Sequence, residues 1–334
     1  MKNSLSRFEF YLLKLETLFE QASKEKNAAL WLYSNNARTP IFMVEGLAKL
    51  YAGIHNKKRF EKIKEHFKLL EDTLGAIDYY DSFAKEFTQN AAIPLAVTEY
   101  LQAQAREKIQ RLNDILTEDK WMGDNAQRIK KIQKKLAGAD WLQPKEEVKG
   151  MMDFYLESIE EIKVLILAAS KGFTQIETEV HALRRKLRWL SIYPQALQGA
   201  IQLTDSGIAD ENIQAYLTPE IVNSAFNKMP DAGNNSHFLL LEKNYFLALS
   251  WMIAALGKLK DSGLKIIAVT EALQQTEALE HDAAQQKAFH VLGTDSGALQ
   301  KILSDATAIT RKYFGEHNLD KLVHGIAKPV GDDR

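Results

Sequence analysis

Hydrophobic residues recur at spacings of three and four along most of the chain. In the first long segment they fall at Phe8, Leu12, Leu15 and Leu18, and this spacing places side chains on one face of an α-helix. The same pattern runs through "FEKIKEHFKLLEDTL", "AQRIKKIQKKLAG", "VKGMMDFYLESIEEIKVLILAAS" and "GALQKILSDATAITRKYF". We find no series of alternating β-branched segments bounded by hairpin turns. The pattern therefore predicts an all-α fold.

Interruptions of the helical pattern carry residues that favour helix ends. Thr39-Pro40 and Thr218-Pro219 each match a capping threonine followed by proline at the first helical position. The segment Leu136–Glu147 contains a glycine and a proline and separates two long helical stretches. We therefore expect one helix to begin at Pro40, another at Pro219, and a break near the middle of the chain.

Charge and composition narrow the classes of function. The 43 basic and 44 acidic residues give a net charge of -1, which argues against attraction of the whole molecule to nucleic acid or to an anionic membrane. The chain has no cysteine, which excludes disulfides, thiolate metal sites and thiol catalysis. Its apolar runs fall short of the roughly 20 residues that span a bilayer, and charges interrupt the N-terminal segment, unlike a signal peptide. We expect no membrane span and a cytoplasmic location.

Two segments share a Leu-Gly pair within a helical pattern, followed by an aspartate. They are Leu69–Phe87, which contains Gly75, and Ser250–Val269, which contains Gly257. A glycine inside a helix costs about 1 kcal/mol relative to alanine, so its recurrence suggests that another element approaches the helix closely at the same point twice. Coincidence between two leucine-rich helices explains the similarity equally well.

The segment "EVHALRRKLRWLSIYP" combines a leucine stripe with a basic face. On a helical wheel one side holds the apolar residues Ile176, Val180, Leu183, Leu187 and Leu190. The opposite side holds the basic residues His181, Arg184, Arg185 and Arg188. No acidic residue occurs between positions 180 and 194. Two interpretations remain open: carboxylates from a neighbouring helix pair with these arginines, or an external anion binds them. Arginine suits phosphate because its planar group donates two hydrogen bonds to two oxygens.

The basic segment "VHALRRKLRWL" resembles the signature of the CHAD family, the conserved-histidine α-helical domains. "LGKLKD", Leu256–Asp261, is similar to the Leu-Gly element that follows later in each repeat of that family. The resemblance implies two consecutive helical-bundle repeats, at 1–141 and 142–326, followed by a tail at 327–334. It also implies binding of inorganic polyphosphate without an accompanying reaction. The anion contacts would then be His181, Arg184, Arg185 and Arg188, with Lys258 and Lys260 as contributors.

The first half of the chain departs from this plan. The helix expected to correspond there is Thr39–Ile54. Matching its leucines to those of the basic segment puts Ile41 in the place of His181 and Val44 in the place of Arg184. The resemblance therefore predicts a degenerate first repeat and a single basic face, in a diverged member of the family.

Other candidate sites are weaker. The basic helix expected at Arg128–Leu136 is typical of a solvated face, although it would also suit an anionic surface. Glu277, His281 and Asp282 lie close in sequence, but the usual helical zinc and di-iron spacings are absent. The chain contains neither a phosphate-binding loop nor a convincing nucleophile–base pair. We expect no enzyme activity, no cofactor and no metal.

The leading hypothesis is a non-catalytic protein that binds polyphosphate or another polyanion on the helix that carries His181. Its affinity should fall as salt rises and should increase toward pH 6 as His181 gains a proton. The alternative is a diverged helical scaffold that binds a protein partner and no phosphate, with its arginines paired internally. Neither hypothesis includes a specific nucleic-acid partner.

Overall fold

The computed structural model describes residues 3–122, 127–207 and 211–328. Within these residues the protein is mostly helical and has one small sheet, which confirms the predicted all-α class. The chain forms two compact units. Unit 1 contains Met1–Ala52, Lys57–Trp141 and Leu264–Ala298, and unit 2 contains Gly53–Asn56, Leu142–Gly263 and Leu299–Arg334. These units are defined by spatial contacts, so the division into two sequence repeats stays a prediction.

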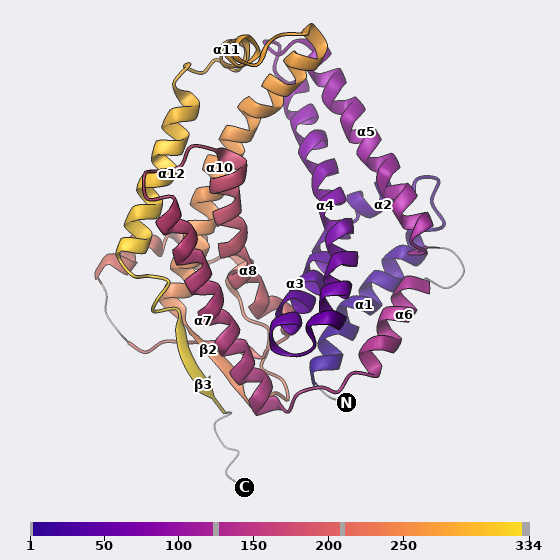
Figure 1. Ribbon diagram of the computed structural model, residues 1–334, viewed down its shortest axis with the longest axis vertical. Helices are drawn as coiled ribbons and strands as arrows, with labels where there is room; N and C mark the ends of the chain where they lie inside the picture. The colour runs from indigo at the N-terminus through magenta and orange to yellow at the C-terminus, as the bar shows by residue number, and fades with distance from the viewer. Residues whose placement is uncertain (1–2, 123–126, 208–210, 329–334) are drawn as a thin grey trace. The chain divides into compact units, whose positions relative to one another are not determined.

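Unit 1 is built from helices around an aromatic core. Its helices are α1 (Asn3–Ala22), α2 (Ala28–Ser34), α3 (Arg38–Ile54, apart from its last two residues), α4 (Lys57–Thr88), α5 (Leu95–Glu118), α6 (Gln127–Ala137), α11 (His281–Leu292) and the part of α10 (Lys243–Glu277) that follows Gly263. The long helices α4 and α5 pack side by side (Figure 1). Glu271 of α10 accepts hydrogen bonds from the hydroxyls of Tyr80, at 3.0 Å, and Tyr100, at 2.9 Å. These two bonds attach α10 to both long helices.

Unit 2 combines helices with the sheet. Its helical elements are α7 (Pro144–Ala168), the π-helix η1 (Ile176–His181), α8 (Ala182–Ala196), the 3-10 helices η2 (Glu211–Tyr216) and η3 (Ala225–Asn227), α9 (Pro219–Val222), α10 up to Gly263, and α12 (Ala298–Gly315) from Leu299 onward. Its strands are β1 (Ile201–Thr204), β2 (Phe238–Glu242) and β3 (Val323–Ala327). Among the helices described in both units, none is long and apolar enough to cross a membrane.

The sheet was not expected from the sequence pattern. Strand β2 lies between β1, to which it is parallel, and β3, to which it is antiparallel. Figure 1 shows β2 and β3 side by side. A bulge interrupts the pairing between Leu240 and Leu241. Most of β2 is buried, and its sequence "FLLLE" begins with four consecutive apolar residues in place of the alternation of a half-exposed strand. Such a short run cannot be distinguished from helix by periodicity.

One of the two predicted helix starts is confirmed. Thr218 has extended backbone angles and precedes Pro219, the first residue of α9. The prediction at Pro40 is wrong, because α3 begins two residues earlier, at Arg38. The expected central break is confirmed, since α6 ends at Ala137 and α7 begins at Pro144. Of the expected tail, Ala327 ends β3, and residues 329–334 lie outside the described residues.

Candidate anion-binding site

The basic helix begins with a turn of π-helix. This form is rare in proteins, and where it occurs it often lies at a functional site. Its start is fixed by Glu179, whose carboxylate accepts hydrogen bonds from the backbone N–H groups of Thr174 and Gln175. Burial by itself would raise the pKa of Glu179, but these bonds lower it. The predicted core stripe is confirmed in full, because all five of its apolar side chains are buried: Ile176, Val180, Leu183, Leu187 and Leu190.

Two glycines of α10 let this segment approach closely. A methyl group placed on Gly263 would lie 2.8 Å from Cδ1 of Ile176. A methyl group on Gly257 would lie 3.0 Å from Nε of Arg184. At Gly257, where the sequence predicted the close approach of a helix, the group that lies close is the tip of an arginine side chain. In unit 1 the same holds at Gly75, where a methyl group would lie 2.8 Å from Nη2 of Arg38.

Arg184 is half-buried between α8 and α10. Its Nε donates a hydrogen bond to the backbone oxygen of Ile253, at 3.1 Å. Burial lowers the pKa of Arg184, and Asp261 opposes this change. Among the described residues, no carboxylate lies within ion-pairing distance of its guanidinium group. The internal pairing with carboxylates that the sequence left open is therefore not found at this arginine.

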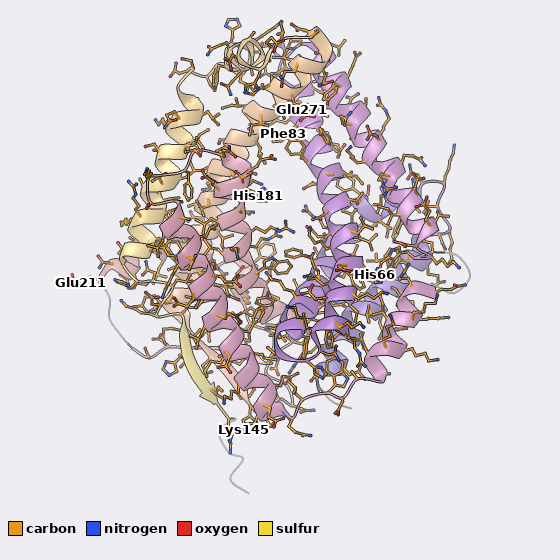
Figure 2. All side chains as sticks on the ribbon, viewed as in Figure 1. His66, Phe83, Lys145, His181, Glu211 and Glu271 are labelled. Carbon is orange, nitrogen blue, oxygen red and sulfur yellow. The ribbon has the colours of Figure 1, made fainter. Side chains whose placement is uncertain are left out.

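His181 lies at the junction of η1 and α8 (Figure 2). Its pKa is lowered to about 4, first by burial and then by the positive charges of Lys260, Arg184 and Arg185, while Asp261 acts in the opposite direction. These four basic residues, His181, Arg184, Arg185 and Lys260, are called the basic cluster below. A phosphate group that enters it would meet several cations from two helices.

The remaining residues of the predicted site lie in different surroundings. Arg188 is half-buried, one turn after Arg184. Lys258 is exposed on α10. Within the cluster, Arg185 is exposed, whereas Lys260 is largely buried and pairs with Asp261 at 2.7 Å. Asp261 is the last residue of "LGKLKD", but no role was predicted for it from the sequence. Its negative charge partly offsets the positive charge of the basic cluster.

This geometry corrects the expectation that His181 gains a proton near pH 6. The side chain is partly buried among cations, so it stays neutral at pH 6 in the protein without ligand. The pKa lies below the roughly 6.5 of an unfolded chain. Neutral His181 therefore favours folding above about pH 6.5, and this contribution is lost as the pH falls from about 6.5 toward 4.

We expect Lys260→Ala to raise the pKa of His181, because it removes the largest of the charge effects that oppose protonation. An NMR titration of the histidine ring protons measures this directly. His66 provides the control within the same sample, since burial and Arg128 lower its pKa and Lys260 is not among the groups that act on it. An unchanged pKa of His181 would contradict the described cluster.

The other candidate regions give no comparable arrangement. In α6 the apolar residues Ile129, Ile132 and Leu136 are buried, so the expected amphipathic helix is confirmed. Its Arg128 pairs with Asp119 at 2.9 Å. Glu277 pairs with Lys287 at 2.5 Å. Over residues 3–122, 127–207 and 211–328, no group of three or more histidine and carboxylate side chains is placed to hold a metal ion.

No family model, no curated protein and no solved structure matches this chain. Membership of the CHAD family stays a prediction. It rests on the two sequence elements that carry the resemblance.

Proposed function

We propose that the basic cluster binds the phosphate groups of inorganic polyphosphate, or of a similar polyanion, without catalysing a reaction. The observation that carries this proposal is the convergence of three cations, Arg184 and Arg185 of α8 and Lys260 of α10, on the partly buried His181, whose pKa burial and these charges lower. A site with a strongly positive potential favours a ligand of high negative charge. The resemblance of "VHALRRKLRWL" and "LGKLKD" to the CHAD signature supports the same ligand. Arg188 and Lys258 are proposed as further contacts.

Arg184 favours phosphate for a second reason. Its guanidinium is partly desolvated and held in place by Gly257 and by the backbone oxygen of Ile253. A pre-positioned arginine loses little freedom when it binds an anion. A charged hydrogen bond also strengthens where water is partly excluded. We therefore assign Arg184 the central contact and Arg185 and Lys260 the flanking contacts.

The scaffold hypothesis has one observation in its favour. Arg184 fills the space over Gly257 and bonds to the backbone of α10, which is also a structural role. Under this hypothesis the arginine fixes α8 against α10, and a protein partner binds elsewhere. For this reason the binding test changes Arg185 and Lys260 and leaves Arg184 in place.

The double substitution Arg185→Ala, Lys260→Ala is expected to weaken binding of fluorescently labelled polyphosphate at least about tenfold, because hydrogen bonds from charged groups contribute roughly 1.5–3 kcal/mol each. Fluorescence polarisation at fixed salt measures the dissociation constant. The matched control is Lys57→Ala, Lys58→Ala, which removes the same charge from two exposed residues of α4.

The control variant should bind as the natural protein does. Equal losses in both variants would mean that only net charge matters. Unchanged binding in the first variant would place the ligand elsewhere and favour the scaffold hypothesis.

A further inference from the structure

Each unit contains an arginine packed over a glycine of a long helix. In unit 1 Arg38, the first residue of α3, lies over Gly75 of α4. In unit 2 Arg184, near the start of α8, lies over Gly257 of α10. In both cases a Cβ on the glycine would lie 3.0 Å or less from an atom of the guanidinium group, so the arginine would have to shift to make room for it.

The surroundings of these two arginines differ at two positions of the long helix. Four residues before the glycine stands Glu71 in α4 and Ile253 in α10. Three residues after the glycine stands Asp78 in α4 and Lys260 in α10. These two positions are seven residues apart, which places them on one helix face.

The carboxylates of α4 hold Arg38. One oxygen of Glu71, Oε1, accepts hydrogen bonds from Nε of Arg38 at 3.0 Å and from Nη2 at 2.8 Å. Oδ2 of Asp78 accepts a bond from Nη1 at 3.3 Å. Tyr33 donates to Asp81 at 2.9 Å and to Asp78 at 3.4 Å, which helps to orient this acidic face.

In unit 2 the carboxylates are replaced. Nε of Arg184 bonds to the backbone oxygen of Ile253, the residue at the position of Glu71. The position of Asp78 is taken by Lys260, one of the cations that act on His181. The exchange therefore removes both carboxylates that bind the arginine in unit 1. The charge that acts on Arg184 in unit 2 is that of Asp261, the ion-pair partner of Lys260.

We infer that Arg38 and Arg184 occupy equivalent positions in the two units. In unit 1 the carboxylates of Glu71 and Asp78 bind Arg38 in the way that an external anion binds Arg184 in unit 2. The inference rests on the proposed function of the basic cluster. Under this inference, the residues at positions 253 and 260 of α10 determine whether the arginine packed over the glycine binds an anion from solution. The alignment of leucines in the sequence had paired Val44 with Arg184. The contacts with glycine instead pair Arg38 with Arg184.

The first test needs no ligand. The double substitution Ile253→Glu, Lys260→Asp reproduces the acidic face of α4 beside Arg184. We expect it to raise the pKa of His181 by about 1 or more above that of the neutral control Ile253→Gln, Lys260→Asn, because nearby carboxylates favour the protonated ring. Histidine NMR measures both. Equal pKa values in the two folded variants would show that carboxylates at these two positions do not act on the basic cluster, and would overturn the equivalence.

The second test measures polyphosphate binding. Ile253→Glu, Lys260→Asp should bind labelled polyphosphate at least about tenfold more weakly than the neutral control, because the carboxylates compete with phosphate for Arg184. Conversely, Glu71→Ile, Asp78→Lys should restore binding to a chain that carries Arg185→Ala and Lys260→Ala. If this combination does not fold, Asp78→Lys is used alone, since the side chain of Asp78 is half exposed.

The outcomes separate the two proposals. If the natural chain binds no polyphosphate but the pKa of His181 responds as expected, the proposed function fails and the equivalence stands. If the natural chain binds polyphosphate and the acidic variant binds it equally well, the inference fails and the proposed function stands. A lack of restored binding in unit 1, with folded protein, also counts against the inference.

Discussion

Raising the salt concentration from about 50 mM to about 200 mM is expected to weaken polyphosphate binding roughly twentyfold. Three cations of the basic cluster, Arg184, Arg185 and Lys260, would each replace a condensed counterion of the polymer. For a flexible single-stranded polyanion the logarithmic slope is roughly -0.7 per contact, so these three contacts alone give the stated loss, and the further contacts Arg188 and Lys258 would add to it. His181 is left out of this sum because its pKa of about 4 keeps it neutral near pH 7.

Binding titrations at four or more salt concentrations measure this slope. The variant Arg185→Ala, Lys260→Ala should show a slope reduced by about two contacts. The control Lys57→Ala, Lys58→Ala should keep the slope of the natural chain. An affinity that does not change with salt would contradict phosphate contacts at the cluster and would indicate an uncharged interface.

Trp141→Ala is expected to destabilise unit 1 by about 3–5 kcal/mol, the usual cost of removing a buried tryptophan. The ring is 5% exposed, and its Nε1 donates to the backbone oxygen of Leu136 at 3.1 Å. Its centre lies between 5.4 and 5.9 Å from the ring centres of three aromatic residues, Phe8, Tyr51 and Phe60. The substitution therefore leaves a cavity among rings that cannot easily close it.

Denaturant unfolding monitored by circular dichroism measures the loss in stability. Phe226→Ala is the matched control, because it also removes an aromatic ring but from a position that is 85% exposed. The control should change the free energy of unfolding by less than about 0.5 kcal/mol. A small loss for Trp141→Ala would contradict the packed aromatic core of unit 1.

The helical class could be predicted from the sequence because helix periodicity is local. The spacing of Ile176, Val180 and Leu183 is enough to identify the buried side of the basic segment, and the structure buries all three. Strand β2 could not be predicted in the same way, because its pairing with β3 joins residues far apart in sequence. Its apolar run shows only that the segment is buried.

The candidate site could be predicted in part. A helical wheel groups His181 with Arg184 and Arg185, but it gives no information about groups that come from another helix. The pKa of His181 depends on burial and on Lys260 of α10, which explains why the expected titration near pH 6 was wrong. The inferred equivalence of Arg38 and Arg184 could not be found from leucine positions, because leucines recur on most of the long helices and allow more than one alignment. The contact of each arginine with a glycine is visible only in the folded structure.

The most direct test of the basic cluster uses His181 itself as the reporter. Its pKa is measured by NMR in the natural chain, without ligand and with saturating polyphosphate. Phosphate bound among Arg184, Arg185 and Lys260 should raise the pKa from about 4 by about 1 or more, because an adjacent negative charge favours the protonated ring. The pKa of His66 should stay unchanged. If polyphosphate saturates the protein and the pKa of His181 remains at about 4, the anion does not bind at this cluster.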